Sequence, residues 1–205
     1  MGLNQGDTDH RKTRCFRDWV VPALVVTVAL VIAVAGDNGR ELLRYDRIAI
    51  ANGEILRLIS GHFAHLGWSH FALNAAGIVL VFFLVGPRFS ARLWLLICAL
   101  IIVVIDAGFW FFQPQLIWYV GLSGLLHGCL AAGVMEGLRQ RQFDDWLIAG
   151  LLVLKLGYEQ LVGPLPGSEA SAGGSVVVAA HLYGAIAGAL IGATLSFRKA
   201  ATAAI

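Results

Sequence analysis

The sequence predicts an all-α integral membrane protein with six transmembrane helices and both termini in the cytoplasm. Of its 205 residues, 58% are apolar and only 14% are charged, which leaves too little polar surface to solvate a globular exterior. Basic residues gather at the ends of the apolar runs that the positive-inside rule assigns to the cytoplasm. The net charge is only +2, which indicates no nucleic-acid partner. The predicted partner is the lipid bilayer. The six runs, each near the ~20 residues that a spanning helix needs, cover residues 19–36, 67–86, 91–112, 121–138, 146–162 and 176–197.

The chain begins with a basic cytoplasmic segment, residues 1–18. The apolar run after it, from Trp19 to Gly36, is longer than the core of a signal peptide and lacks a clear small-x-small cleavage site before a soluble domain. We therefore expect this run to be retained as the first span of one membrane domain at residues 19–198, followed by a short cytoplasmic tail at residues 199–205.

Two loops on the outer side are long enough to suggest a function. The first, Asp37 to Leu66, mixes charged with apolar residues, which predicts that it lies partly in the membrane interface. The last, Gly163 to Ser175, is rich in Gly, Pro, Ser and Ala and has little to pack with. It is predicted to be a mobile cover.

Polar side chains in several spans fall at similar heights in the membrane. Counting up from the nearest cytoplasmic arginine at ~1.5 Å per helical residue places Ser123, His181 and His70 at about 24, 26 and 27 Å. Asn74 and Asp106 come out at about 21 Å. Because polar groups in a span face the bundle interior and mark functional paths, this layer predicts a shared site. The alternative for each residue is an interhelical hydrogen bond that only packs the helices.

The fourth and sixth spans carry small residues at four-residue spacing, which let two helix backbones approach closely. Such contact would bring the Ser123 hydroxyl within hydrogen-bond reach of the His181 imidazole, as activation of a nucleophile by a base requires. On its own, each ridge is a helix-packing motif. The ridges consist of Gly124, Gly128 and Ala132 in the fourth span, and Ala180, Gly184, Gly188 and Gly192 in the sixth.

Acyl transfer also needs donors for a developing oxyanion. Ser123 is predicted to open a helix, so the backbone N–H groups there are free and carry the positive end of the helix dipole. His70 and Asn74, at i and i+4, lie on one helix face, and both can donate hydrogen bonds. His127, one turn after Ser123, is expected either to lie under the serine against the His181 ring or to be a core histidine bonded to backbone.

Two other chemistries compete with acyl transfer. His62, His65 and His70 in one short stretch suggest zinc, but no acidic ligand accompanies them, so no metal and no cofactor is predicted. Lys155 and Glu159, at i and i+4, are predicted to form a neutralised pair that fixes helix packing. A proton-coupled transporter can use such a pair, yet the sequence has no duplicated broken helix.

Asp106 is a further acidic residue within a span. It could orient a histidine, as the acid of a catalytic triad does, but the sequence leaves its direction open.

These residues resemble the rhomboid intramembrane serine proteases. The resemblance runs from Asp37 to the last helix and implies a six-helix rhomboid-like bundle. It implies that Ser123 is the nucleophile and His181 the base, that His70 and Asn74 help to form the oxyanion hole, and that no third acid is required. The matching elements are Gly121-Leu122-Ser123-Gly124, His181 with Gly184 and Gly188, and His70-Phe71-Ala72-Leu73-Asn74.

Two departures from the family pattern are informative. The family's Trp-Arg of the first loop is Leu56-Arg57 here, and an aromatic residue one turn after the serine is His127. The chain looks most like the rhombosortase branch in three segments: Gly121-Leu122-Ser123-Gly124-Leu125-Leu126-His127-Gly128, the segment from Lys155 to Glu159, and Ala180-His181-Leu182-Tyr183-Gly184. That similarity implies an enzyme of the bacterial inner membrane, with its site facing the periplasm, which processes membrane-anchored proteins bearing C-terminal Gly-Gly sorting tails.

Alternatives remain at the level of sequence. The chain could be a general rhomboid protease, or an inactive rhomboid-fold protein that binds membrane helices. The presence of both Ser123 and His181 argues against the inactive form. The sequence leaves open whether water or an amine resolves the acyl-enzyme.

Overall fold

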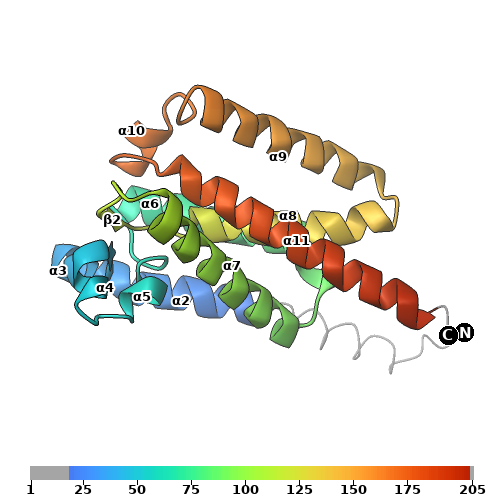
Figure 1. Cartoon of the computed structure of the whole chain (residues 1–205), viewed down its shortest axis with the longest axis horizontal. Helices are drawn as coiled ribbons and strands as arrows, with labels where there is room; N and C mark the ends of the chain where they lie inside the picture. The colour runs from blue at the N-terminus through green and yellow to red at the C-terminus, as the bar shows by residue number, and fades with distance from the viewer. Residues whose placement is uncertain (1–18, 204–205) are drawn as a thin grey trace, which may run out of the picture.

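A computed structural model describes residues 19–203 of the chain, with side chains up to residue 195. The predicted basic segment 1–18 lies outside the described residues, as do residues 204–205. The described part is mostly helical (Figure 1). One long helix corresponds to each predicted apolar run: α2 (Val20–Val34), α6 (Trp68–Val85), α7 (Ala91–Phe112), α8 (Ser123–Arg139), α9 (Phe143–Leu161) and α11 (Val178–Ala203).

Some boundaries differ from the predicted ones. Helix α9 begins at Phe143 rather than at residue 146, because two acidic residues occupy its first turn and favour the helix N-terminus. Helix α11 continues to Ala203, through most of the segment predicted as a tail, because no glycine or proline follows Gly192 to end it.

Within residues 19–203, three helices are long and apolar enough to cross a membrane: Trp68–Arg88, Ala91–Phe112 and Val178–Leu195, with mean hydropathy between 1.6 and 2.6. A fourth span is reached if α2 and the short α3 (Gly36–Leu43), which are bent by 116° relative to each other, count as one. Helix α8 has only 17 residues, and α9 carries four charged residues along its length. The chain is thus a multi-pass membrane protein, while the count of six spans and the cytoplasmic termini stay predictions.

The first outer loop folds into a platform rather than an irregular connection. It contains α3, β1 (Tyr45–Asp46), α4 (Arg47–Ala51) and α5 (Arg57–Ser60), and β1 pairs antiparallel with β2 (Trp118–Tyr119). The Asp46 carboxylate caps α4 by accepting hydrogen bonds from two backbone N–H groups at 3.1 Å.

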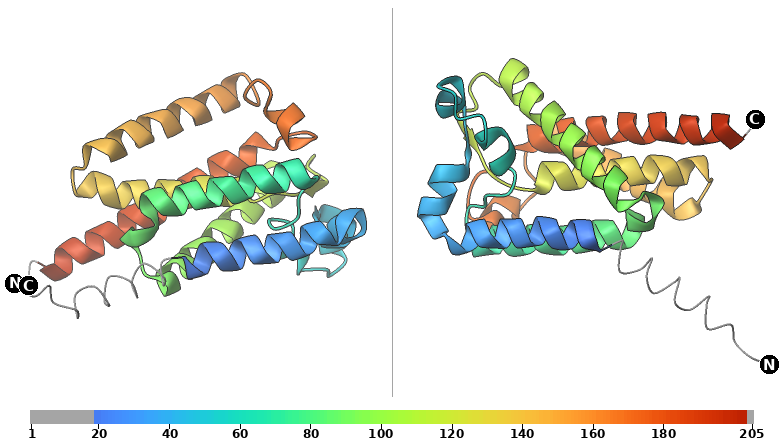
Figure 2. Two further views of the ribbon diagram at one scale, coloured as in Figure 1. Left: turned by 180° about the vertical axis from the view of Figure 1, so that it is seen from behind. Right: turned by 90° about the horizontal axis from the view of Figure 1, so that it is seen from below.

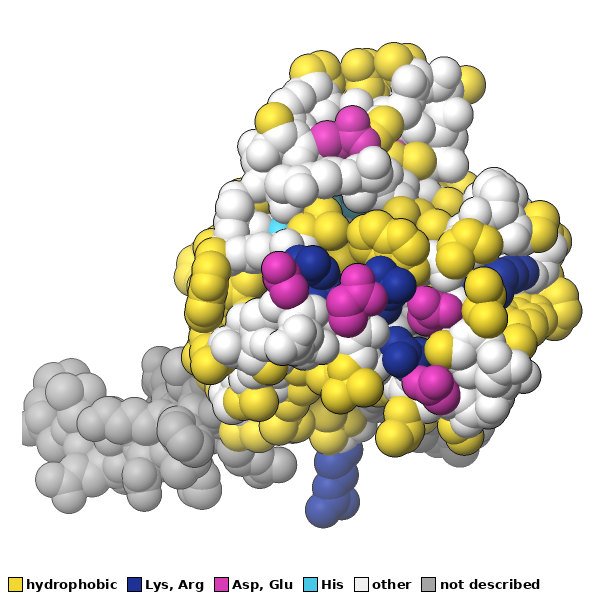
Figure 3. Space-filling view, turned by 90° about the vertical axis from the view of Figure 1, so that its left-hand side faces the viewer, with side chains coloured by type: hydrophobic (Ala, Val, Ile, Leu, Met, Phe, Trp, Pro, Cys, Tyr) yellow, Lys and Arg dark blue, Asp and Glu magenta, His cyan; other side chains and the backbone are white. Residues whose placement is uncertain are grey.

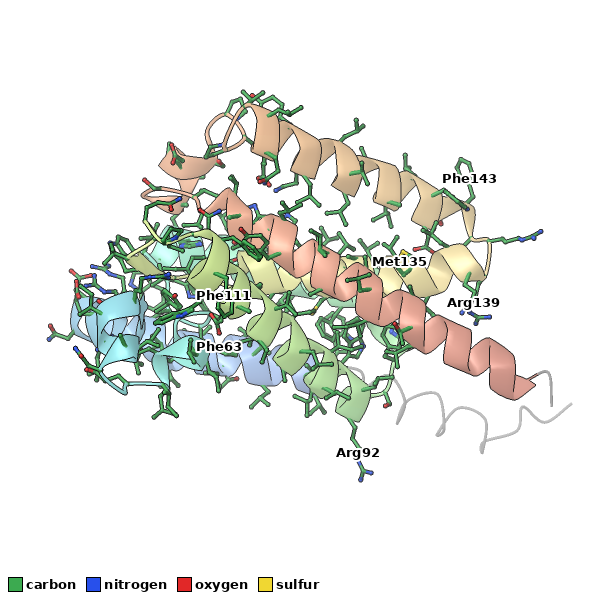
Figure 4. The ribbon with its side chains drawn as sticks, viewed as in Figure 1. Phe63, Arg92, Phe111, Met135, Arg139 and Phe143 are labelled. Atoms are coloured by element: carbon green, nitrogen blue, oxygen red, sulfur yellow. The ribbon has the colours of Figure 1, made fainter. Side chains whose placement is uncertain are left out.

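Charged side chains gather on this end of the molecule (Figure 3). They pair locally as Arg40 with Asp37, Arg44 with Glu41 and Asp46, and Arg57 with Glu54. Figure 4 shows Phe63 and Phe111 toward the platform, and Arg92 and Arg139 toward the opposite end. The platform and the basic helix ends therefore mark opposite sides of the bundle.

Helix α8 packs against α6, α7, α9 and α11, and most of its residues are buried. The core around it consists of branched aliphatic side chains such as Ile97, Ile101, Ile105 and Leu125. Large apolar side chains on the other helices face outward, as lipid contact requires. Helix α9 forms the upper edge of the molecule in Figure 1 and in the opposite view of Figure 2, left.

The predicted close contact between the fourth and sixth helices is confirmed. A methyl group added at Gly128 would lie 2.7 Å from the carbonyl oxygen of Gly184, and one at Gly188 would collide with the carbonyl oxygen of Gly128. Only residues without a side chain permit this approach. The ridge therefore fixes the position of α11 along α8.

Candidate active site

Ser123 is the first residue of α8, as predicted, and a tightly held turn precedes it. Gly121 has φ of +128°, a conformation that side chains disfavour. Its N–H donates to the Gly61 carbonyl at 3.2 Å, and its carbonyl accepts from the Tyr119 hydroxyl at 2.6 Å. A side chain at Gly121 would also meet the His70 ring, with Cβ 2.9 Å from Cε1. The absence of a side chain at Gly121 thus permits both the turn and the close contact with the His70 ring.

The structure places His181 beside Ser123. His181 Nε2 lies 2.9 Å from Ser123 Oγ, and the imidazole is 4% exposed. The helices reach this distance because Gly124 leaves room for the backbone of α11: a methyl group there would lie 2.9 Å from the Ala180 carbonyl oxygen. Gly184 faces Gly124 in the same way one turn later.

His127 lies under this pair. Its ring stacks on that of His181, with centroids 4.2 Å apart and planes 17° apart. Its Nδ1 is 2.6 Å from the Ser123 carbonyl oxygen; because that oxygen can only accept, Nδ1 donates. Both placements expected from the sequence, against the His181 ring and bonded to backbone, occur together.

Glu159 contacts His181, which was not predicted from the sequence. Glu159 Oε2 lies 2.9 Å from His181 Nδ1, while Oε1 pairs with Lys155 Nζ at 2.6 Å. The predicted Lys155–Glu159 pair is therefore present, but it also reaches the imidazole. The estimated height of Glu159 in the membrane could have predicted this contact. Glu159 lies 18 residues above Arg141, about 27 Å up, which is the level of His181.

Asp106, the other acidic residue considered for a histidine, lies elsewhere. Its Oδ1 is 3.2 Å from His62 Nε2, beneath the platform. It does not contact His181, because α7 turns this side chain toward the first outer loop.

Two polar residues of α6 line the same cavity as Ser123. The Leu66 N–H donates to His70 Nδ1 at 3.3 Å, so the ring proton resides on Nε2, which points toward the turn at Gly121. Asn74 Nδ2 donates to the His70 carbonyl at 3.1 Å, which leaves its second amide hydrogen available. His70 and Asn74 thus each offer one donor.

The cavity has a volume of about 210 Å³. The last outer loop covers it with Leu165, the short helix α10 (Ser168–Ala172) and Ser175. The Ser69 hydroxyl donates to the Ser171 carbonyl and ties this cover to the start of α6. The predicted cover over the site is thus present and contains a short helix, while its mobility stays a prediction.

Of the three histidines considered for zinc, His62 bonds an acidic residue while the other two lie against each other. His62 bonds Asp106, whereas His65 packs edge-on against His70 with ring centroids 5.0 Å apart. Burial, with the nearby His70, lowers the pKa of His65 to about 3, so this ring is neutral at physiological pH.

A different set could hold an ion. Among the described residues, His127, Glu159 and His181 offer ligand atoms within 4.8 Å of one another. However, both His181 nitrogens already face Ser123 and Glu159, and the stacked rings point their nitrogen lone pairs along parallel planes. This arrangement suits proton transfer better than convergence on a metal.

Most of the chain matches a known protein family. Residues 52–198, most of the chain, match the Rhomboid domain family. No curated protein matches the chain.

Proposed function

The chain belongs to the rhomboid family of intramembrane serine proteases, and we propose that it cleaves membrane-anchored proteins with Ser123 as the nucleophile and His181 as the base. The observation that carries the proposal is the 2.9 Å contact between Ser123 Oγ and His181 Nε2 inside the bundle. A hydroxyl and an imidazole at this distance form the minimal unit of nucleophilic catalysis.

The steps follow from this geometry. Ser123 Oγ bonds to the peptide carbonyl carbon while its proton moves to His181 Nε2. The C–N bond then breaks, and His181 returns the proton to the leaving amine. A water molecule or an external amine then attacks the carbonyl carbon of the resulting ester while His181 Nε2 accepts its proton. The bond between that carbon and Ser123 Oγ breaks, and His181 returns the proton to Ser123 Oγ.

The negative charge on the carbonyl oxygen needs donors. Nε2–H of His70, the free amide hydrogen of Asn74 and backbone N–H groups at the start of α8 supply them. Gly121, Gly124, Gly184 and Gly188 support the site by allowing the turn and the close helix contact.

The proposed substrates are proteins with C-terminal sorting tails, in which Gly-Gly precedes an apolar helix and a basic end. A cavity of about 210 Å³ favours residues with little side-chain bulk at the cut. Glycine also unwinds a helix readily and exposes its backbone. We place the enzyme in the bacterial inner membrane, with both termini cytoplasmic and the site facing the periplasm.

Mass spectrometry of protein C-termini tests this proposal. Membranes that contain the protein should yield a tail-bearing substrate cut at or just outside the outer membrane edge, and membranes with Ser123→Ala should not. Replacing both glycines of the tail with valine should block cleavage. If other rhomboid substrates are cut while Gly-Gly tails are ignored, the protein is a general rhomboid protease.

A further inference from the structure

Glu159 is an unusual residue for its position. Helix α9 buries only two of its side chains, Asp145 and Glu159, and Glu159 is 3% exposed. A carboxylate in a membrane span is costly, so its partners indicate its role. Each of its oxygens faces a different partner: Oε1 faces Lys155 of the same helix, and Oε2 faces His181 of α11.

The contact with His181 decides where the imidazole carries its proton. An ionised carboxylate only accepts hydrogen bonds, so Nδ1 of His181 donates to it. Nε2 then keeps its lone pair, which is the form that can accept the Ser123 proton. The same carboxylate faces the imidazolium that forms once the proton has moved.

Lys155 makes this carboxylate tolerable in the bundle. The pair of Lys155 and Glu159 is neutral as a whole, and the 2.6 Å contact fixes which oxygen is left for His181. His127 stacks on one face of the imidazole, so the ring is held in its plane by Glu159 and against its face by His127. His70 and Tyr119 are further titratable residues that line the cavity of this site.

We propose that Glu159 is a positioning residue of the catalytic site, which acts on His181 as the acid of a Ser–His–Glu triad, with Lys155 orienting it. The proposal rests on the proposed function, because it assigns Glu159 a role through His181. It adds an acid from α9 to a site otherwise built from α6, α8 and α11.

Glu159→Gln provides a sharp test. Lys155 should hold the glutamine oxygen and turn its NH₂ group toward Nδ1, which forces the His181 proton onto Nε2. We expect the rate of Ser123 labelling by a fluorophosphonate to fall on the order of 10²- to 10⁴-fold, because His181 with its proton on Nε2 cannot accept the proton of Ser123. For tail cleavage, kcat should fall to a similar degree while KM stays unchanged.

The double variant Lys155→Met/Glu159→Gln separates positioning from packing. Without the ammonium, the glutamine can turn its oxygen to Nδ1, so we expect labelling to recover at least about tenfold over Glu159→Gln alone. A purely structural role predicts the reverse, because a second buried group is lost.

Glu136→Gln is the matched control. Glu136 is also a buried glutamate paired with a basic residue, Arg139, but it lies at the far end of α8. It should label at the wild-type rate. If Glu159→Gln does not fold, Glu159→Asp decides: its carboxylate falls one methylene short of His181, so labelling should drop on the order of tenfold or more.

The outcomes distinguish the two proposals. Wild-type labelling rates in folded Glu159→Gln, or in Glu159→Asp, would overturn the role of Glu159 and leave the proposed function intact. Failure of the wild-type protein to label at Ser123 would instead overturn the proposed function.

Discussion

Helices α8 and α11 are joined backbone to backbone, whereas α9 is attached to the same bundle through charged side chains. Along the first interface, the glycines of one helix face carbonyl oxygens of the other. Along α9, large apolar residues point outward, with Leu161 88% exposed. Its buried groups are Asp145, paired with Arg88 near one end, and Glu159, paired with His181 near the other.

The difference separates two ways of placing a side chain. Close packing holds Ser123 and His181 at a fixed distance, because neither backbone can move without a collision. An ion pair between Asp145 and Arg88 holds one end of α9, and the hydrogen bond between Glu159 and His181 holds the other. Between them, a methyl group added at Gly150 or Gly157 would meet nothing within 4 Å. A larger side chain should therefore be destabilising between α8 and α11 and tolerated in the middle of α9.

The largest effect is expected for Gly188→Val. The new side chain collides with the Gly128 carbonyl, a backbone atom that cannot turn away. We expect a loss of at least about 3 kcal/mol of stability and complete loss of cleavage, because α11 must move off α8. Thermal unfolding in detergent measures it. Gly157→Val on α9, where nothing lies within 4 Å, is the control and should stay folded and active.

His70 and Asn74 lie on α6, which packs against α8. His70→Ala and Asn74→Ala should each slow cleavage on the order of ten- to a thousand-fold, because one oxyanion donor of several is removed. Steady-state kcat measures the loss. The matched amide control is Gln160→Ala on α9, an exposed residue that should leave kcat unchanged. Unchanged rates for both α6 variants would place the oxyanion site elsewhere.

A smaller effect is expected for Asp145→Asn, which removes the charge that anchors the inner end of α9. Arg88 Nη1 lies 2.7 Å from the fully buried Asp145 side chain, while Arg88 itself is 16% exposed. Because one partner reaches solvent, we expect a loss of about 2 kcal/mol, below the ~3–5 kcal/mol of fully buried pairs.

The neighbouring Asp144→Asn controls for the loss of charge, since Asp144 is exposed and should be neutral. Fluorophosphonate labelling of Asp145→Asn at a permissive temperature should match the wild type. Equal unfolding temperatures for the two aspartate variants would contradict the anchoring role.

Gly157→Ala should have the smallest effect, and in the opposite direction. Alanine favours a helix over glycine by up to about 1 kcal/mol, and no neighbour opposes the added methyl group. The unfolding temperature should rise slightly, whereas Gly184→Ala on α11 should lower it. A destabilised Gly157→Ala would show that α9 packs more tightly than its contacts indicate.

The same contrast explains what the sequence could predict. Four-residue spacing of small residues and equal heights in the membrane sufficed for the contact of α8 with α11, because both are properties of straight helices. The contact between Glu159 and His181 depends on how α9 is rotated and tilted, and a helix with so few buried residues has no periodic pattern to reveal this.

The platform was also beyond prediction in its detail. The bend at Gly36, with φ of +64°, and the pairing of Tyr45 with Tyr119 join segments that are distant in sequence. Asp106 bonds to His62, which belongs to the first loop, so this partner could not be predicted without the fold of that loop.

Covalent labelling of Ser123 tests the central claim most directly. The purified full chain, treated with a fluorophosphonate and digested, should carry the adduct on Ser123. Ser123→Ala should abolish labelling and His181→Ala should reduce it to near background, with both variants folded, and the double variant should be no worse than either, since the two residues act as a unit. Labelling that persists in Ser123→Ala, or that is unaffected by His181→Ala, would contradict a serine nucleophile activated by this histidine.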